Sequence, residues 1–249
     1  MLHLAPNTSA GGSRVLHPRS VSVLDGYFAT RPAEDLVDYA LSGALGRIAL
    51  VSSFGAEAAV LLHMVSRIAP ATPVLFLDTA LLFPETLAYQ QSLATRLGLS
   101  DVRVLRADTS TQDPDDTLHR RDPDACCALR KTAPLQEALQ EFDGWLTGRK
   151  RAGQGPRATL PHAEPEHPSG RIKLNPLAAW TADRTAAYFE SHALPRHPLV
   201  AQGYASIGCA PCTTPVAPGE DARAGRWRGT EKLECGIHFS NGQAERAAS

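Results

Sequence analysis

Short apolar runs alternate with longer helical patterns, and this alternation constrains the fold more than any other feature of the sequence. The runs lie at residues 47–51, 74–77, 102–105, 144–146 and 171–174. Each is short and apolar enough for a strand buried on both faces of a parallel sheet. Strands that alternate with helices are typical of α/β proteins. The sequence therefore predicts an α/β fold, with a parallel sheet that has a mixed edge and carries helices on both faces.

Helical spacing follows each of the first two runs. Val60, Met64 and Ile68 recur on one side of a helix after the first run. A second helical pattern begins at Pro84, and proline suits the first turn of a helix because its missing N–H has no helical partner there. We therefore expect a helical crossover after each early strand.

The loop after the first predicted strand consists mostly of small and polar residues. Residues 52–57 read Ser-Ser-Phe-Gly-Ala-Glu and lead into the first predicted helix. Backbone amides at a helix N-terminus bind anions. A plain tight turn explains the same residues, and the Gly-Lys-Ser/Thr ending of the ATPase phosphate loop is absent. The candidate binding residues of this loop are Ser53, Phe54, Gly55, Ala56 and Glu57.

A second loop strengthens the anion-binding interpretation. Residues 77–85 follow the second predicted strand and begin with Leu77, Asp78 and Thr79. Both loops leave the sheet at its carboxyl edge, where open α/β folds bind nucleotides. The sequence thus predicts a loose N-terminal tail, a nucleotide-binding α/β domain and a C-terminal segment, at residues 1–24, 25–202 and 203–249.

Two stretches lack regular periodicity. Residues 151–170 are rich in glycine, proline and histidine, which indicates a long mobile loop. From residue 203 onward, turn-forming residues, charges and three cysteines predominate. Because this C-terminal segment has few apolar anchors, we expect it to be ordered by something other than a hydrophobic core, such as a bound metal.

Charge, apolar runs and cysteine count exclude several classes of protein. The formal net charge is -1, so no overall positive field favours nucleic acid. The longest apolar stretches, such as 48–51 and 58–62, fall short of the roughly 18–20 residues of a membrane helix. The first 24 residues lack a secretory apolar core, and five cysteines, an odd count, fit a secreted disulfide framework poorly. We expect a cytoplasmic protein that binds neither membrane nor nucleic acid.

Four cysteines form two close pairs in the sequence. Cys126 and Cys127 are adjacent, and Cys209 and Cys212 form a C-x2-C pair. Four thiolates are the number that a 4Fe-4S cluster requires. They also satisfy a tetrahedral zinc ion on count alone, so the residues leave both alternatives open. Lys131 lies one helical turn beyond Cys127, which would place a cation beside such a thiolate site.

The fifth cysteine stands alone near the end of the sequence. Cys235 precedes a glycine in Glu-Cys-Gly-Ile-His, at residues 234–238. A lone cysteine on a mobile, glycine-flanked tail suits a nucleophile, because the thiolate is the reactive form and nearby positive charge lowers its pKa. His238 is a candidate contributor of such charge. An incidental exposed thiol and a solvated histidine are the alternatives.

In their order, these motifs resemble those of the sulfonucleotide reductases, which are relatives of the ATP pyrophosphatases. The resemblance runs from about residue 51 to residue 238. The matching segments are residues 52–57, 77–86, 121–135, 145–151, 173–177, 203–215, 219–227 and 234–238. It implies an ATP-pyrophosphatase-like (adenine nucleotide alpha hydrolase-like) fold with an irregular cysteine-containing C-terminal segment. The Cys-Cys…Cys-x-x-Cys set is the ligand pattern of the family's iron–sulfur branch, which implies a 4Fe-4S cluster with Lys131 linking cluster and substrate.

The resemblance also implies a reaction. In it, the Cys235 thiolate attacks adenosine 5′-phosphosulfate, AMP leaves, and an S-sulfocysteine remains on the enzyme. Reduced thioredoxin, or a glutaredoxin-like donor, then releases sulfite by thiol exchange. The activity would be that of an adenylyl-sulfate reductase in assimilatory sulfate reduction and cysteine biosynthesis. A homo-oligomer is compatible with the sequence, which does not define the oligomeric state.

Basic residues in the matching segments are candidates for binding the phosphosulfate. Planar guanidinium groups bind such oxygens through charge-assisted, often bidentate hydrogen bonds. The alternative for each residue is a solvated surface charge. Around residues 154–157 the sequence departs from the usual pattern of the family, which weakens the case for Arg157. The candidates are Gly148, Arg149, Lys150, Arg157, Arg223 and Arg226.

Three other functions compete with this interpretation. A reductase of 3′-phosphoadenylyl sulfate, or one of dual specificity, shares the mechanism, although enzymes specific for that substrate generally lack the four cluster cysteines. An ATP pyrophosphatase-type adenylyltransferase shares the nucleotide loops but has no need of Cys235. A zinc or redox-sensing protein explains the cysteines but not the two loops.

Overall fold

A six-stranded sheet forms the centre of the protein. The computed structural model describes residues 17–151, 157–166, 169–230, 232, 234, 237, 239–240 and 243–244. The strand order is β3-β2-β1-β4-β6-β5, in which all neighbours are parallel except β5 and β6. The strands are β1 (Ile48–Ser52), β2 (Val74–Leu77), β3 (Val102–Leu105), β4 (Gly144–Thr147), β5 (Ala163–Pro165) and β6 (Ile172–Leu174). The predicted α/β fold with a mixed edge is confirmed.

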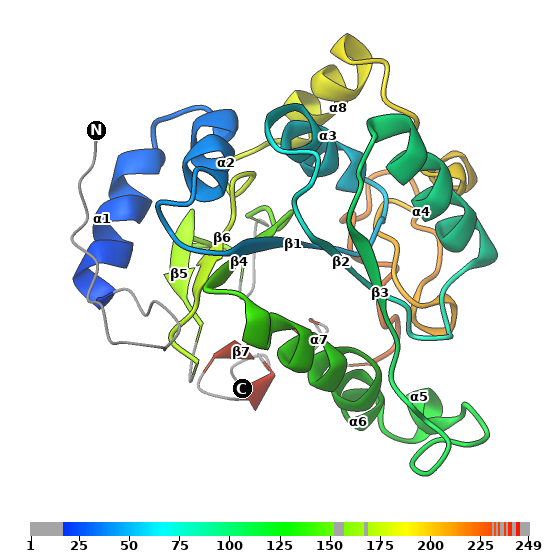
Figure 1. Cartoon of the computed structure of the whole chain (residues 1–249). Coiled ribbons are helices and arrows are strands. Elements are labelled where there is room, and N and C mark those ends of the chain that lie inside the picture. The colour runs from blue at the N-terminus through cyan, green and yellow to red at the C-terminus, as the bar shows by residue number, and fades with distance from the viewer. Residues whose placement is uncertain are drawn as a thin grey trace.

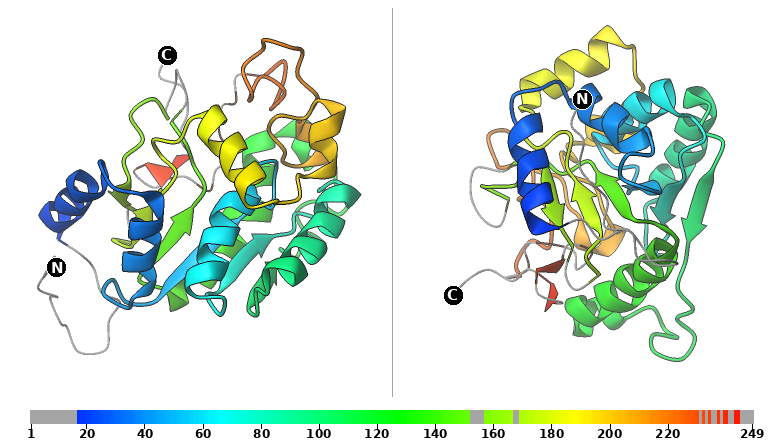
Figure 2. Two further views of the ribbon diagram at one scale, coloured as in Figure 1. Left: turned by 90° about the horizontal axis from the view of Figure 1, so that it is seen from above. Right: turned by 60° about the vertical axis from the view of Figure 1, so that its left-hand side comes forward.

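Helices cover both faces of the sheet (Figures 1 and 2). One group contains α1 (Pro18–Phe28), α2 (Ala33–Leu41), α3 (Ala58–Ile68), α4 (Pro84–Leu97) and α8 (Ala182–Ser191). The opposite face carries α6 (Pro123–Cys127), the π-helical turn η1 (Ala128–Thr132), α7 (Ala133–Ala138) and η2 (Leu139–Glu141). The remaining short helices are α5 (Leu118–Arg121), η3 (Pro198–Gln202) and η4 (Ala210–Cys212). The two expected crossover helices, α3 and α4, are present, and α4 begins at Pro84.

The side chains of β1 explain why the sheet is buried on both faces. Ile48 and Leu50 belong to the apolar cluster under α2, α3 and α4, whereas Ala49 and Val51 belong to the cluster under α7. Successive strand residues point to opposite faces, so a continuous apolar run contributes to two cores at once. Because both faces of β1 are apolar, this strand is buried on both sides in the centre of the sheet.

The N-terminal part of the chain differs from its prediction. Helix α1 begins at Pro18, with the ring of His17 accepting a hydrogen bond from the amide of Arg19 (3.2 Å). Val21 and Leu24 are buried in the main core. Residues 18–24 therefore belong to the folded body and not to a loose tail, because two apolar side chains one turn apart pack against the core. Residues 1–16 lie outside the described residues.

The predicted 151–170 loop contains a strand. Residues 163–165 form β5, which pairs antiparallel with β6 and places Ala163 opposite Leu174. Three residues flanked by proline and histidine carry no periodic signal, so this edge strand could not be recognised in the sequence. The described C-terminal segment is irregular, as expected, apart from η4 and the antiparallel pair of β7 (Phe239–Ser240) and β8 (Gln243–Ala244). The boundary near residue 203 remains a prediction.

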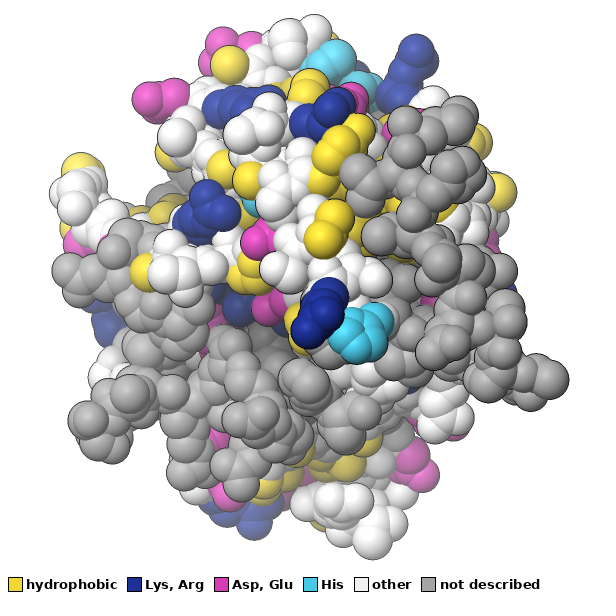
Figure 3. All heavy atoms as spheres, turned by 90° about the vertical axis from the view of Figure 1, so that its left-hand side faces the viewer, with side chains coloured by type: hydrophobic (Ala, Val, Ile, Leu, Met, Phe, Trp, Pro, Cys, Tyr) yellow, Lys and Arg dark blue, Asp and Glu magenta, His cyan; other side chains and the backbone are white. Residues whose placement is uncertain are grey.

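The surface of the described residues agrees with the near-zero net charge. On the face shown in Figure 3, the coloured basic and acidic side chains are interspersed. Among the described helices, none has both the length and the apolar character that crossing a bilayer requires.

Candidate active site

A cavity of about 240 Å³ lies where β1, β2 and β4 end. Its wall combines the loop after β1, the loop after β2, Gly148 after β4, and residues 205–209 of the C-terminal segment. The sequence predicted that the first two loops would meet at this edge. The long-range fold brings the C-terminal segment to the same place.

The loop after β1 lines the cavity with four of its five candidate residues. These are Ser53, Gly55, Ala56 and Glu57, and α3 begins directly after them. Phe54 does not line the cavity, because its ring is fully buried against Phe76 with the ring centroids 5.2 Å apart. Phe54 also has a positive φ of 48°, which is rare for an aromatic residue and gives the loop its sharp turn. Phe54 therefore fixes the shape of the loop through its buried ring and its backbone turn, without contact with the cavity.

The loop after β2 contributes two of its three candidate residues to the cavity. Leu77 and Thr79 line it, whereas Asp78 does not. The buried Asp78 carboxylate pairs with Arg106 and accepts a hydrogen bond from the amide of Ala80 (2.9 Å). Asp78 thus holds the turn of this loop in the present structure, and its contact with a substrate remains a prediction.

Basic side chains surround one part of the cavity. Its lining includes Lys131, Arg149, Arg157, Arg223 and Arg226. Lys150 is different, because its ammonium group donates to Glu57 (2.7 Å) and Thr185 (3.2 Å) and the residue is not part of the cavity wall. The convergence of several cations suits an anionic ligand.

Two glutamates that the sequence did not single out hold these cations in place. Glu164 accepts from Arg149 (3.1 Å) and Asn175 (3.0 Å) and pairs with Lys173 (3.0 Å). Asn175 and Lys173 belong to one of the quoted motifs, but Glu164 lies in the stretch that reads as a loop. Buried guanidinium groups need carboxylate partners, but no local pattern in the sequence identifies Glu164 as that partner.

The second glutamate, Glu234, precedes Cys235. Its carboxylate is held by Arg157 and Arg223 and is buried. Burial by itself raises the pKa of this carboxyl, but hydrogen bonding to Arg157 and the charges of Arg157, Arg223 and Arg149 outweigh that effect and lower the pKa overall. Cys235 and His238 lie outside the described residues, so their predicted roles stay predictions.

The four paired cysteines meet in a second, smaller cavity beside the first. Cys126, Cys127, Cys209 and Cys212 all line it. Cys126 and Cys127 end α6, and the helix continues through the π-helical turn η1, a feature that is frequent at functional sites. Thr79, Lys131 and Cys209 belong to the walls of both cavities. The two sites therefore share a wall.

The thiols experience different electrostatic environments. Burial, together with the neighbouring Cys127 and Cys209 thiols, raises the pKa of Cys126 to about 11. Burial also acts to raise the pKa of Cys209, but the charge of Lys131 and hydrogen bonds from Thr79 and Lys131 lower it overall. The Oγ1 of Thr79 lies 3.2 Å from the sulfur of Cys209. Cys209 is thus better prepared for the thiolate form than Cys126.

Arg130 connects the cysteine helix to the loop after β2. Its guanidinium is fully buried and pairs with Asp113 and Asp116, each at 2.5 Å, and it donates to the carbonyl oxygen of Thr79 (2.8 Å). Sequence reasoning missed this residue, although it lies between Cys127 and Lys131 in a quoted motif. Its contacts indicate that it sets the position of one cavity wall relative to the other.

Gly208 makes room for Arg226. A Cβ atom at Gly208 would lie 2.2 Å from Nη2 of Arg226, far inside van der Waals contact. The guanidinium of Arg226 also lies over the ring of Trp227, 4.5 Å from its centroid, in a cation–π arrangement. The glycine and the tryptophan together direct this arginine to the cavity.

The fold and the site define a class of protein: an α/β protein of the nucleotide-binding kind, with a cation-lined cavity at the carboxyl edge of its sheet and a four-cysteine cavity beside it. The model of the phosphoadenosine phosphosulfate reductase domain matches residues 47–215. The chain belongs to this family.

Relatives and a solved structure agree with this assignment. An adenosine 5′-phosphosulfate reductase of Chelativorans sp. is 48% identical over 87% of this chain and 89% of its own. An enzyme of the same name from Mesorhizobium japonicum is 50% identical over 78% of this chain and 76% of its own. The crystal structure of a phosphoadenylyl-sulfate reductase from Candida auris, in a phosphate complex, has a TM-score of 0.73 and 25% identity, and the match covers 82% of this chain and 100% of that one. The predicted family and fold are confirmed.

Proposed function

We propose that this protein reduces adenosine 5′-phosphosulfate to sulfite and AMP, with Cys235 as nucleophile and thioredoxin as the electron donor, in sulfate assimilation. The observation that carries the proposal is the shared wall between the cation-lined cavity and the four-cysteine cavity. The names of the relatives from Chelativorans and Mesorhizobium support the choice of substrate. A cytoplasmic, reducing compartment suits a chemistry that depends on free thiols.

The cavity offers separate places for the parts of the substrate. The loops after β1 and β2 suit the adenosine and the α-phosphate, because strand-to-helix loops at this edge bind nucleotides. Arg149, Arg223 and Arg226 suit the oxygens of the phosphosulfate. Preorganised cations stabilise charge that develops on the phosphate as the bond to sulfur breaks.

The first step transfers the sulfonate to the enzyme. The Cys235 thiolate attacks the sulfur atom of the substrate, an S–S bond forms, and the S–O bond to the phosphate breaks. The electron pair of that bond leaves with AMP. The enzyme then carries an S-sulfocysteine, and no external electron has been used.

The second step releases sulfite by thiol exchange. A thiolate of reduced thioredoxin attacks the Cys235 sulfur, and sulfite leaves with the electron pair of the S–S bond. A mixed disulfide between the two proteins results. The second thiol of thioredoxin resolves it, which restores the Cys235 thiolate and leaves thioredoxin oxidised by two electrons.

The donor set of the second cavity fits a 4Fe-4S cluster. Four thiols from two segments line one small cavity next to Lys131. Four thiolates are the number that such a cluster requires, and the Cys-Cys…Cys-x-x-Cys order of these residues resembles the ligand pattern of the family's iron–sulfur branch. We therefore propose the cluster rather than zinc.

Cys126, Cys127, Cys209 and Cys212 would hold the cluster, and Lys131 would stand between it and the substrate. When bound, the cluster would supply a negatively charged group that orders the C-terminal segment and tunes the electrostatics at the substrate, while the electrons for sulfite release come from thioredoxin. There Lys131 would neutralise charge on both sides of the shared wall.

The alternative substrate is 3′-phosphoadenylyl sulfate. The solved structure from Candida auris is named a phosphoadenylyl-sulfate reductase, so this substrate is the second candidate for the present chain. The two substrates differ only in the 3′-phosphate, so the proposed roles of Cys235 and of the arginines are the same for both.

The test is a direct assay of the anaerobically purified, iron-containing protein with reduced thioredoxin. Each nucleotide is supplied separately at the same concentration, and AMP and sulfite are measured. Faster turnover of adenosine 5′-phosphosulfate supports the proposal, and preference for the 3′-phosphorylated form replaces the substrate but keeps the mechanism. The variant Cys235→Ser should bind nucleotide and release no sulfite. Unchanged sulfite release by this variant would refute the mechanism.

A further inference from the structure

We propose that Glu234 is a positioning residue for the nucleophile: Arg157 and Arg223 bind its carboxylate and so hold the residue that precedes Cys235 in the sequence beside the cavity. The role in the reaction rests on the proposed function. The anchor itself does not, because it consists of contacts between described residues.

Both carboxylate oxygens of Glu234 accept hydrogen bonds from arginine side chains. Arg157 donates through Nε to Oε1 and through Nη2 to Oε2, the latter at 2.7 Å, and Arg223 donates through Nη2 to Oε2 at 3.3 Å. A bidentate arginine–carboxylate pair fixes orientation as well as distance. Only 3% of the Glu234 side chain is exposed, so solvent screens the contact weakly.

The carboxylate lies behind the cavity wall and not in the cavity. Arg157 and Arg223 line the cavity, whereas Glu234 is not among the lining residues. A guanidinium group has five N–H donors, so an arginine that binds Glu234 on one side keeps donors for a substrate anion on the other. Glu234 therefore does not occupy the place of the substrate. It sets the direction of two arginines and offsets their mutual repulsion.

The described residues before and after Cys235 in the sequence, Glu234 and Ile237, both contact the body of the protein. Glu234 is bonded to Cys235, and adjacent Cα atoms are about 3.8 Å apart, so an anchored Glu234 confines its neighbour. Two residues beyond Cys235, Ile237 lines the cavity and packs against the apolar cluster that contains Val51 and Trp145. The polar anchor at residue 234 and the apolar one at residue 237 thus lie on either side of Cys235 in the sequence.

A polar anchor also suits the two-step reaction. Cys235 must stand over the substrate in the first step and meet thioredoxin in the second. Arg157 and Arg223 face both Glu234 and the cavity, so the polar anchor consists of the same groups that would bind the anion. Occupation of the cavity by an anion would therefore act directly on the two groups that hold the tail.

The experiment compares Glu234→Gln, which removes the charge and keeps the shape, with Glu234→Asp, which keeps the charge and shortens the side chain. Three quantities are measured in the iron-containing protein. They are hydrogen exchange of the peptide that spans residues 230–240, the affinity for AMP, and the single-turnover rate of Cys235 sulfonation by adenosine 5′-phosphosulfate without thioredoxin.

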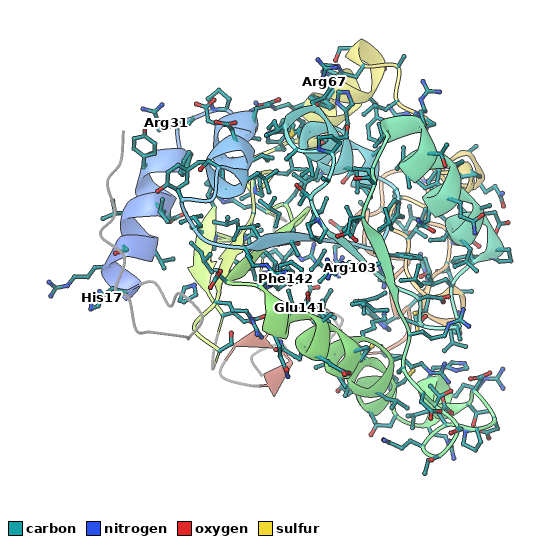
Figure 4. All side chains as sticks on the ribbon, in the orientation of Figure 1. His17, Arg31, Arg67, Arg103, Glu141 and Phe142 are labelled. Carbon is teal, nitrogen blue, oxygen red and sulfur yellow. The ribbon has the colours of Figure 1, made fainter. Side chains whose placement is uncertain are left out.

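For Glu234→Gln we expect faster exchange of the tail peptide and a fall of about tenfold or more in the sulfonation rate, as for the loss of a charge-assisted bidentate contact. AMP affinity should change less than about threefold, because Arg157 and Arg223 remain. Glu234→Asp should recover part of both losses. The control is Glu141→Gln, which removes another glutamate between two arginines, Arg47 and Arg103, but on the exposed surface near Phe142 (Figure 4). It should match the wild-type protein in all three measurements.

Several outcomes would overturn the anchor. Tail exchange in Glu234→Gln equal to that of the wild-type protein would do so. An unchanged sulfonation rate despite a released tail would show that the contact does not position Cys235. A loss of AMP affinity as large as the loss of rate would make Glu234 a support of the arginines alone. If the wild-type protein forms no sulfonated Cys235, the proposed function fails, while the exchange measurement still decides whether Glu234 anchors the tail.

Discussion

The α/β body and the C-terminal segment from residue 203 are ordered by different forces. In the body, all five residues of β1 are buried, and its apolar side chains belong to two hydrophobic cores. The hydrophobic effect therefore holds the helices and strands of the body together. The segment from 203 to 230 has few buried apolar side chains, chiefly Ile207 and Trp227.

Polar contacts replace the missing core in the C-terminal segment. An isolated bridge joins Thr213 to Arg226, the amide of Trp227 donates to the carbonyl of Cys212 (3.0 Å), and Arg228 pairs with Glu220 (2.9 Å). Each such contact contributes little by itself. The body is thus the scaffold that apolar burial forms, whereas local polar contacts hold the described part of the segment. This difference can be tested by perturbing the C-terminal segment and the body separately.

Removal of iron should have the largest effect, and it should be confined to the C-terminal segment. If a cluster on Cys209 and Cys212 orders this segment, chelation under anaerobic conditions should raise amide exchange over residues 203–230 by about 100-fold or more, because metal binding and local folding are coupled. Exchange in β1, β2 and β4 should stay within a few-fold of its original rate. A segment that remains protected without iron would contradict the comparison.

A substitution that leaves a cavity in the core of the body should have the opposite effect to iron removal: it should lower the stability of the body and leave the active site unchanged. Leu93 on α4 is fully buried in the main core and does not line the active-site cavity. Leu93→Ala should lower the free energy of unfolding by about 3 kcal/mol, as for other buried leucines. Urea denaturation measures this change. Nucleotide affinity at a temperature well below the unfolding transition should stay the same, and a large loss of affinity would mean that body and site are not separable.

Gly208→Ala should disturb the site and spare the stability of the protein. The new Cβ would displace the end of the Arg226 side chain, which can move because it is flexible. We expect a loss of about tenfold in AMP or substrate affinity, equal to about 1.4 kcal/mol, from one misplaced guanidinium. The midpoint of urea unfolding should change little. Full affinity in this variant would show that Arg226 does not bind the ligand.

The smallest effect concerns the pH dependence of the body. Burial lowers the pKa of His162 and of His197 below the ordinary value. The folded state therefore binds fewer protons than the unfolded state, and the stability from the neutral rings is complete above the unfolded pKa of about 6.5 and falls as the pH decreases toward the folded values. Urea midpoints at pH 7.5 and pH 5.5 should show a decrease smaller than that of Leu93→Ala.

His197 supplies the matched variant for that measurement. Its Nδ1 accepts from the amide of Leu199 (3.2 Å), and its Nε2 lies 3.0 Å from Oγ1 of Thr86. His197→Gln should reduce the pH dependence and leave the part that is due to His162, since an amide does not titrate in this range. An unchanged slope in this variant would assign the effect to other groups.

Local patterns were sufficient for much of the body. The predicted strand at 74–77 coincides with β2, that at 102–105 with β3, and the helix expected near Pro84 begins at that residue. Apolar runs and a proline at a first turn are signals that lie within a few residues of the sequence. The folded core then buries the same apolar residues that form these runs. β5 was missed because three residues at an edge carry no such repeat, and the N-terminal boundary was wrong because Val21 and Leu24 are too few to show a period.

The sequence alone determined five of the six strands of the main sheet, the two crossover helices after the first two strands, the two loops at the carboxyl edge of the sheet, and the family to which the chain belongs. Tertiary structure decided which polar groups meet: that Cys127 and Cys209 line one cavity, that Asp78 turns inward to Arg106, and that Glu234 is held by Arg157. The physical reason is that apolar burial follows the period of a strand or helix, whereas an ion pair or a shared metal site depends on two distant residues reaching one point in space, which no local pattern records.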